Sequence, residues 1–268
     1  MKFKNILLVH NGKPTDEHNK VLNKVERLLE DNNLKYNIVR DFDLQKSILN
    51  KKYIVITVGG DVTFISASHY IKKTPIIGIN SEPKTSEGAW TSLKSDEIDE
   101  LEEILKGNYK TRNVKRIDVY RNDVLLDSHA LNEVYVGAAN QFHTSRYELI
   151  FKNKKEYQKS SGVLISTSFG SNSWFKSAGG NPFQEQDQLR FVVREPFEGK
   201  IFCPKLTSGK ISQGESLIMK SKRKDGGIIA IDSTLIYEFN NTDNVEINLS
   251  NNELNILEPV EKYQEKNI

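Results

Sequence analysis

The stretch Tyr53-Ile54-Val55-Ile56-Thr57-Val58-Gly59-Gly60-Asp61-Val62-Thr63 decides the fold of this chain. Its first six residues are β-branched or aromatic with almost no polarity, which is typical of a parallel strand buried on both faces. Two glycines and an aspartate follow at once, and apolar residues then recur at helical spacing as far as Ile71. A strand, a glycine turn and a helix in this order predict the α/β arrangement that binds ligands beyond the carboxyl ends of the strands.

The glycine turn and its aspartate suit a phosphorylated ligand. Glycine lets the backbone approach a phosphate, and a helix N-terminus offers unpaired N–H groups and the positive end of the helix dipole. A carboxylate at Asp61 would repel phosphate, so we expect it to orient a hydroxyl or a metal ion, or to accept a proton. The alternative is a tight turn in which Asp61 only caps the helix.

The composition is that of an ordinary soluble globular protein, with 268 residues, 37% of them hydrophobic and 28% charged. The net charge of +2 is too small to predict a nucleic-acid partner. Cys203 is the only cysteine, and the five histidines lack metal-ligand spacing, so neither an internal disulfide nor a cysteine zinc site is expected. No run approaches the roughly 20 apolar residues of a membrane helix, and we expect a cytoplasmic protein without a membrane partner.

Strands and helices alternate through residues 1–111, which predicts a domain with a parallel sheet covered by helices. The expected strands are Ile6–Val9, Tyr36–Val39, Tyr53–Val58 and Pro75–Ile79. The expected helices are one capped by Thr15 or Asp16, a short one over Leu44–Leu49, the one after the glycine turn, and one that Ser95 or Asp96 opens and Gly107 ends.

The pattern changes in residues 112–268, where short strands and turns replace the helical period. The expected strands are Ile117–Tyr120, Leu131–Val136, Tyr147–Phe151, Gly162–Thr167, Leu189–Val193 and Ile228–Ile231. This part predicts a second, β-rich domain, with a tail that can return to the first domain.

Two segments of the β-rich part carry polar side chains beside apolar strands. The first, Ala130–Val136, contains the adjacent pair Asn132-Glu133, whose donors and acceptors suit ribose hydroxyls or a base edge. The second, Ser160–Trp174, is a strand followed by a turn of small residues and an aromatic side chain. Taken singly, each is also explained by structure alone, as a turn cap and as a strand-to-helix corner with a core tryptophan.

Together with the glycine turn, these segments make the chain resemble the NAD kinase family over nearly its whole length. The glycine-glycine-aspartate-glycine-threonine loop of the family is matched by Gly59–Thr63, and its asparagine-glutamate pair by Asn132-Glu133. Its glycine-rich strand and turn are matched by Gly162–Thr167, Gly170-Ser171 and Ser177–Gly180. The local sequence is most similar to the mitochondrial-type branch of the family, notably at residues 78–80, 86–88 and 160–162.

The resemblance implies a Rossmann-like, phosphofructokinase-like α/β domain followed by a β-rich sandwich. It implies that ATP phosphorylates the 2′-hydroxyl of the adenosine ribose of NAD, with Asp61 as the catalytic base or orienting group. It also implies contacts with the nucleotides from Gly59, Gly60, Val62, Thr63, Asn80, Asn132, Glu133, Thr167, Asn172, Ser173, Trp174 and Ser177. Adenine stacking on Trp174 is one hypothesis, and a core position for this side chain is the other.

The resemblance leaves several points open. Val62 replaces the last glycine of the family loop, and a β-branched residue with φ > 0 would be strained by roughly 1–3 kcal/mol. Such strain would slow the enzyme, whereas a side chain projecting into the phosphate position would leave an NAD(P)-binding protein without turnover. A lipid or other small-molecule kinase of the same superfamily is a further alternative. We expect Mg²⁺ to arrive with ATP. The resemblance implies a β-rich domain that binds the nucleotide and supports oligomerisation as a homodimer or homotetramer, and it leaves the phosphoryl donor open between ATP and polyphosphate.

Overall fold

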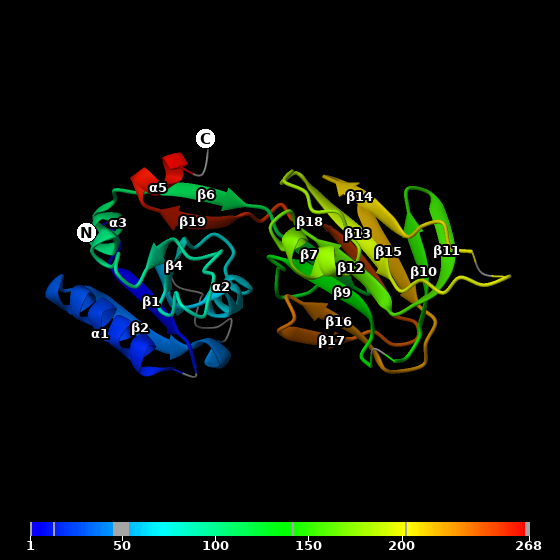
Figure 1. The fold of residues 1–268 in the computed structure, drawn as a ribbon, viewed down its shortest axis with the longest axis horizontal. Helices are drawn as coiled ribbons and strands as arrows, with labels where there is room; N and C mark the ends of the chain where they lie inside the picture. Colours follow the sequence, from blue (N-terminus) through cyan, green and yellow to red (C-terminus); the bar gives the residue numbers. More distant parts are fainter. Residues whose placement is uncertain (1, 13, 45–53, 141, 202, 266–268) are drawn as a thin grey trace. The chain divides into compact units, whose positions relative to one another are not determined.

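The computed structural model describes residues 2–12, 14–44, 54–140, 142–201 and 203–265 of the chain. These residues divide into two compact units, one made of residues 1–114 and 252–268 and the other of residues 115–251 (Figure 1). The boundary expected between residues 111 and 112 falls inside a strand, β6 (Lys110–Val114). The tail, whose return to the first domain the sequence leaves open, groups with the first unit.

The first unit is an α/β fold built on a mainly parallel sheet. Its strands are β1 (Asn5–His10), β2 (Lys35–Arg40), β3 (Ile54–Gly59), β4 (Ile76–Asn80), β5 (Leu93–Lys94), β6 and β19 (Leu254–Glu258). Its helices are α1 (Asp16–Asp31), the 3-10 turn η1 (Asp41–Asp43), α2 (Asp61–Ser68), α3 (Asp99–Lys106) and α5 (Val260–Glu265). The strand order is β2-β1-β3-β4-β19-β6, with β5 beside β4, and β6 runs antiparallel to β19.

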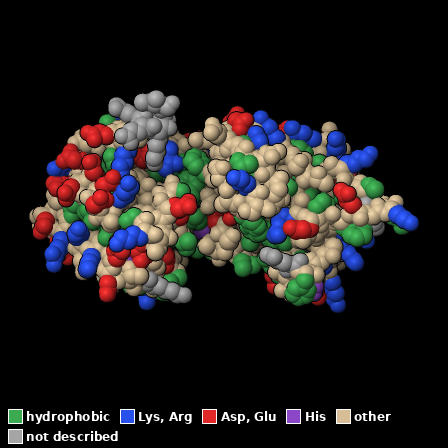
Figure 2. Space-filling model, viewed as in Figure 1, with side chains coloured by type: hydrophobic (Ala, Val, Ile, Leu, Met, Phe, Trp, Pro, Cys, Tyr) green, Lys and Arg blue, Asp and Glu red, His purple; other side chains and the backbone are tan. Residues whose placement is uncertain are grey.

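Apolar stripes attach the helices to this sheet. Helix α1 begins where the Thr15 hydroxyl accepts the N–H of His18, and it buries Val21, Val25 and Leu29 against the strands. Helix α3 ends at Gly107, which has a φ of +114° that favours glycine. The opposite face of α3 is acidic (Figure 2), and acidic residues in the first turn of a helix favour its dipole.

The second unit is a sandwich of two antiparallel sheets. One sheet has the order β11-β10-β15-β18-β7-β8 and the other the order β14-β13-β12-β9-β16-β17. The strands of the first are β7 (Ile117–Arg121), β8 (Val124–Leu125), β10 (Ser145–Phe151), β11 (Lys154–Ser160), β15 (Ser216–Ser221) and β18 (Asn244–Leu249). Those of the second are β9 (Glu133–Ala138), β12 (Gly162–Ser166), β13 (Gln188–Arg194), β14 (Ser208–Ser212), β16 (Gly227–Ile231) and β17 (Leu235–Glu238).

Alternate side chains of both sheets form one core, which includes Val119 and Leu149 from the first sheet and Val134 and Ile165 from the second. Two short helical segments, η3 (Gly170–Asn172) and α4 (Trp174–Ser177), follow β12. This core is what makes the β-rich part a sandwich.

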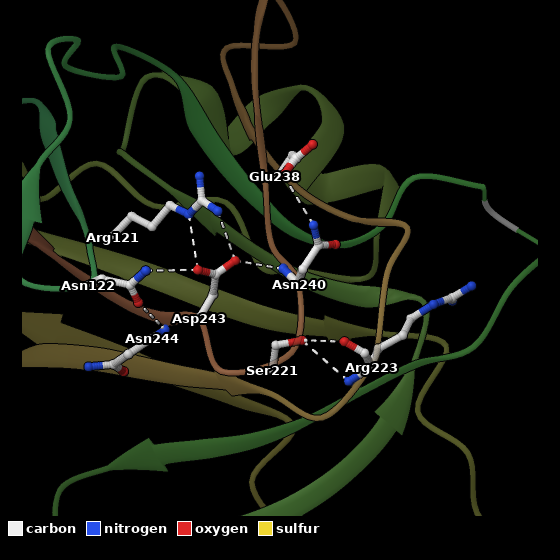
Figure 3. Close-up of polar contacts among 8 residues, drawn as sticks. All are labelled: Arg121, Asn122, Ser221, Arg223, Glu238, Asn240, Asp243 and Asn244. Carbon is white, nitrogen blue, oxygen red and sulfur yellow. Dashed lines mark hydrogen bonds and ion pairs between the residues drawn. The ribbon is translucent and has the colours of Figure 1, made fainter.

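A buried carboxylate ties two turns of the sandwich together (Figure 3). Asp243 accepts hydrogen bonds from the Arg121 guanidinium at 3.0 and 3.2 Å, the Asn122 amide at 2.8 Å and the Asn240 N–H at 2.7 Å. Burial raises the pKa of Asp243, but these donors outweigh it and hold that pKa below the ordinary value. The turn after β7 is thereby fixed to the turn before β18.

The predicted fold class is confirmed, while several element bounds differ. Helix α2 begins at Asp61 rather than after Thr63, and α3 begins at Asp99, a few residues after the predicted start. The short helix predicted over 44–49 lies outside the described residues apart from Leu44. Strand β6, which the expected boundary divides, pairs with β19 of the tail in the sheet of the first unit.

Candidate functional site

The glycine turn joins β3 directly to α2. A Cβ atom on Gly59 would lie 2.5 Å from the Thr63 hydroxyl oxygen, and one on Gly60 would lie 2.5 Å from that of Ser86. Neither glycine has a positive φ, so close packing rather than backbone conformation requires them. The turn therefore packs closely against Thr63 of the helix and against Ser86, and its contact with a phosphate stays a prediction.

Asp61 is the first residue of α2, and its carboxylate is held by backbone donors. One oxygen accepts the N–H of Trp90 at 2.8 Å and the other accepts the N–H of Ala89 at 3.1 Å. The helix cap is Gly60, which has no side chain, so the alternative in which Asp61 caps the helix is wrong. Because a carboxylate has about four acceptor positions, two remain for a ligand.

Val62 has the backbone conformation of the α-helix, and its φ is not positive. Its side chain is 64% exposed. The strain considered for a β-branched residue in the glycine loop therefore does not occur, because a helical φ is ordinary for valine. The substitution leaves the start of α2 intact.

Thr63 and Asn80 organise loops around this turn. The Thr63 hydroxyl donates to Asp41 at 2.9 Å, and the other oxygen of Asp41 accepts the N–H of Gly12 at 3.1 Å. Asn80, which pairs with Gly59 across β3 and β4, donates to the Ser86 carbonyl at 2.9 Å. Both side chains are buried and used within the protein, so their contact with a nucleotide stays a prediction.

The asparagine-glutamate pair lies at the start of β9 in the second unit. The Asp232 carboxylate, which is 6% exposed, accepts the backbone N–H groups of Leu131 and Asn132 at 2.7 Å and of Glu133 at 3.0 Å. Three donors on one carboxylate fix the path of the backbone at the pair.

Glu133 is the most unusual carboxylate of the described residues. It is 7% exposed, and its Oε2 atom is buried without a hydrogen-bond partner. Burial, together with the charge of Asp232, raises the pKa of Glu133 to about 7. An unpartnered buried oxygen is costly for the free protein and is a ready acceptor for a hydroxyl of a ligand.

The turn after β12 packs against the same pair. The Thr167 hydroxyl donates to the Leu131 carbonyl at 2.9 Å, and the Thr167 N–H donates to the Asn132 carbonyl at 2.9 Å. A Cβ on Gly170 would lie 2.4 Å from the Asn132 carbonyl oxygen. Thr167 is thus buried and supports the backbone of Asn132, and its predicted role as a nucleotide contact stays a prediction.

Trp174 does not occupy the core position that was one of its two hypotheses, and adenine stacking on it stays a prediction. It is partly buried against the small cluster around Phe175, so it is not a core residue. Its ring lies 5.4 Å from that of Tyr135, and the Arg194 guanidinium lies 5.3 Å from its ring centre. Stacking of adenine on Trp174 therefore competes with these neighbours.

The three other residues predicted in this segment, Asn172, Ser173 and Ser177, are exposed. The Ser173 hydroxyl donates to the Gly170 carbonyl at 3.0 Å, and the Ser177 hydroxyl to the Ser173 carbonyl at 3.3 Å. These residues lie at the solvent-facing side of η3 and α4, where a ligand can reach them.

The predicted site residues thus form two groups, one in each unit. The first contains Gly59, Gly60, Asp61, Val62, Thr63 and Asn80, and the second contains Asn132, Glu133, Thr167, Asn172, Ser173, Trp174 and Ser177. The structure adds Asp41, Asp232 and Arg194, which sequence reasoning missed. Only Asp232 carried a signal, as an acid directly after the apolar strand Ile228–Ile231.

Among the described residues, no group of three or more His, Cys, Asp or Glu side chains is placed to hold a metal ion. Within the same residues, no helix has the length and apolar character needed to cross a membrane.

Known kinases resemble this chain in sequence. An NAD kinase of Clostridium tetani is 28% identical over 264 residues, which cover 95% of this chain and 86% of that protein. A probable NADH kinase of Oryza sativa subsp. japonica is 25% identical over 86% of this chain and 78% of that protein. The mitochondrial NAD kinase 2 of Rattus norvegicus is 26% identical over 59% of this chain and 48% of its own length. No protein-family model matches the sequence.

Solved structures share the fold. The yeast NADH kinase complexed with NADH has a TM-score of 0.80 at 13% identity, over 97% of this chain and 84% of that one. The NAD kinase of Archaeoglobus fulgidus in complex with ATP has a TM-score of 0.73 at 19% identity, over 97% and 96%. The chain is thus similar in sequence to NAD and NADH kinases along most of its length, and it shares the fold of two solved members of these enzymes over 97% of it.

Proposed function

We propose that the protein is an NAD kinase, which transfers the γ-phosphoryl group of ATP to the 2′-hydroxyl of the adenosine ribose of NAD and so makes NADP. Similarity to relatives that are NAD and NADH kinases, along most of the chain, supports the reaction class. The observation that carries the proposal is the Asp61 carboxylate, which two backbone N–H groups orient beside a glycine turn.

Asp61 acts on the attacking hydroxyl in this proposal. The ribose 2′-oxygen forms a bond to the γ-phosphorus while the bond to the β,γ-bridging oxygen of ATP breaks, and the hydroxyl proton passes to Asp61. Phosphoryl transfer depends mainly on positioning and charge neutralisation. An acid fixed by two donors supplies the positioning, since its remaining acceptor positions have a defined direction.

Asn132 and Glu133 bind the dinucleotide. Glu133 offers a buried oxygen that has no hydrogen-bond partner in the protein. A ribose hydroxyl that donates to it would remove the desolvation penalty of this unsatisfied acceptor. Asn132 adds both a donor and an acceptor at the adjacent position.

ATP and Mg²⁺ complete the proposed reaction. We propose that Mg²⁺ enters bound to the phosphates of ATP, where it neutralises the charge that develops on transfer. The helix N-terminus at Gly60 and the backbone of the glycine turn suit the phosphate groups.

The alternatives drawn from the sequence lose support. Slowing by backbone strain is removed because Val62 is helical. Loss of catalysis rested on a Val62 side chain that projects into the phosphate position, and the Val62→Gly comparison described below tests it. A lipid kinase of the superfamily is disfavoured because the relatives named above are NAD and NADH kinases.

The purified protein should be incubated with Mg²⁺ and each pair of acceptor (NAD or NADH) and donor (ATP or polyphosphate). We expect NADP from NAD and ATP, detected by chromatography against authentic standards. If NAD gains no 2′-phosphate from ATP, the proposed activity is refuted, and the other pairs show which acceptor or donor is used instead.

We also propose a homo-oligomer, which the relatives' names do not address. The edge strands β8 and β17 of the two sheets expose Val124 and Ile236, which are 67% and 65% accessible. Exposed apolar side chains on sheet edges favour association. Sedimentation equilibrium of the wild type should give a dimer or tetramer, and Val124→Lys with Ile236→Lys should shift it toward the monomer.

The cytoplasmic location stays a prediction of the sequence.

A further inference from the structure

The turn that binds Asp61, residues 88–92, is held in place by the C-terminal segment of the first unit. The Ser92 hydroxyl donates to the Leu257 carbonyl in β19 at 2.7 Å. The Lys262 ammonium of α5 donates to the Ser92 carbonyl at 3.1 Å. Two residues more than 160 positions away in the sequence thus contact the residue that ends this turn.

Lys262 is itself fixed by a second contact. Its ammonium group pairs with the Glu97 carboxylate, which also accepts the Lys94 N–H at 2.8 Å. The Lys262 and Glu97 side chains are 29% and 26% exposed. Partial burial reduces screening by solvent, so this pair restrains Lys262 more than a fully exposed pair would.

The Trp90 side chain of this turn contacts α2 and the Arg112–Glu258 ion pair. Trp90, whose N–H binds Asp61, is 4% exposed and stacks on Phe64 of α2 with ring centres 6.0 Å apart. The Arg112 guanidinium lies 5.8 Å from the Trp90 ring centre and pairs with Glu258 of β19 at 2.8 Å. The Trp90 ring therefore lies between Phe64 of α2 and Arg112 of β6, and the C-terminal segment holds Arg112 through Glu258.

We propose that residues 254–262 form a positioning clamp for Asp61, with Lys262 as the residue that fixes the Asp61-binding turn during phosphoryl transfer. The inference rests on the proposed function. Lys262 is a positioning residue because it reaches Asp61 only through Ser92 and the N–H groups of residues 89 and 90. A small displacement of an orienting group lowers turnover more than it lowers binding of the substrate.

The kinetic test compares Lys262→Met with Lys106→Met. Lys106 is a lysine of the same unit that pairs with Glu102 and Glu103, so its loss removes the same charge without removing a contact of the clamp. We expect Lys262→Met to lower kcat about tenfold with the KM for NAD within about twofold. Lys106→Met should match the wild type, and Lys262→Arg should recover most of kcat. Equal kcat in Lys262→Met and wild type would overturn the clamp.

A spectroscopic readout separates the clamp from the activity. Trp90 and Trp174 are the two tryptophans of the chain, so in a Trp174→Phe background the emission reports on Trp90 alone. Lys262→Met in that background should shift the Trp90 emission to longer wavelength, because the turn opens toward water. An unchanged spectrum would contradict the clamp even if the protein phosphorylates NAD, whereas a shifted spectrum in a protein without kinase activity would refute only the proposed function.

Should Lys262→Met fail to fold, Ser92→Ala carries the same test. It removes the hydroxyl that donates to Leu257 and keeps the backbone carbonyl that binds Lys262. We expect a kcat about threefold below the wild type and a small red shift of the Trp90 emission. Wild-type values in both measurements would refute the contribution of β19 to the clamp, which is the part of the proposal that Ser92→Ala tests.

Discussion

The buried carboxyl of Glu133 lowers the stability of the free protein and offers an acceptor for the proposed NAD substrate. Its buried oxygen lacks a partner, and burial with the nearby Asp232 raises its pKa to about 7. A carboxyl whose pKa is higher in the folded protein than in the unfolded chain destabilises the fold as pH rises. The cost is absent below the unfolded value of 4.5 and complete above about 7.

Glu133→Gln should therefore stabilise the free protein at pH 8 and impair its use of NAD. The expected gain is up to about 3 kcal/mol, since each pKa unit corresponds to about 1.4 kcal/mol. At pH 4.5 to 5 the gain should nearly vanish, because Glu133 is then protonated. Denaturant unfolding of both proteins at the two pH values measures this difference, and an equal difference at both values would show that the carboxyl does not titrate as expected.

Val62→Gly tests the departure from the family loop. Because Val62 is helical and exposed, glycine relieves no strain and should lower stability by no more than about 0.5 kcal/mol. We expect the rate of NADP formation to stay within about threefold of the wild type. A tenfold or greater acceleration would mean that the valine side chain obstructs the phosphate position.

At the scale of elements, the site depends on turns whose partners are distant in the sequence. Asp232, in the turn after β16, binds three backbone N–H groups at the start of β9, about 100 residues earlier. The strand pairing of β9 with β16 brings the two turns together, with Val134 opposite Ile231. The geometry of the asparagine-glutamate pair is therefore a property of the sheet and not of the motif.

Asp232→Asn should loosen this turn. The amide keeps one acceptor and places donors against backbone N–H groups, so we expect a loss of about 2–3 kcal/mol of unfolding free energy. The KM for NAD should rise several-fold because Asn132 and Glu133 lose their support. Asp225→Asn, at an exposed aspartate of the same unit, is the control. If Asp232→Asn and Asp225→Asn unfold with the same free energy, the three hydrogen bonds contribute nothing.

On the scale of the whole molecule, the sequence predicts an α/β part and a β-rich part. It does not predict which sheet the strands near the boundary and in the tail join. Strand β3 was predictable because a parallel strand buried on both faces is a continuous apolar run. Strand β6, with the sequence Lys-Thr-Arg-Asn-Val, is polar and lies at the sheet edge, so it carries no such signal. Its partner β19 follows about 140 residues later, and local pattern cannot reveal such a pairing.

The same limit applies to the site. The glycine turn, Asp61 and the Asn132-Glu133 pair are local motifs, and their residues could be named from the sequence. The turn that orients Asp61 and the carboxylate that supports Glu133 come from other parts of the chain. Thr167 and Asn80 matched the family pattern, yet their side chains bond within the protein, which only the folded chain reveals.

The most direct test of the central claim compares NADP formation by Asp61→Asn with that by Asp16→Asn. Each aspartate is the first residue of a helix in the first unit, α2 and α1 respectively. We expect Asp61→Asn to lower kcat by about 10²–10⁴-fold, the usual contribution of a positioned acid or base, while NAD still binds. Asp16→Asn should equal the wild type. An Asp61→Asn enzyme with kcat within threefold of the wild type would contradict the role of Asp61 as the base or orienting group of phosphoryl transfer.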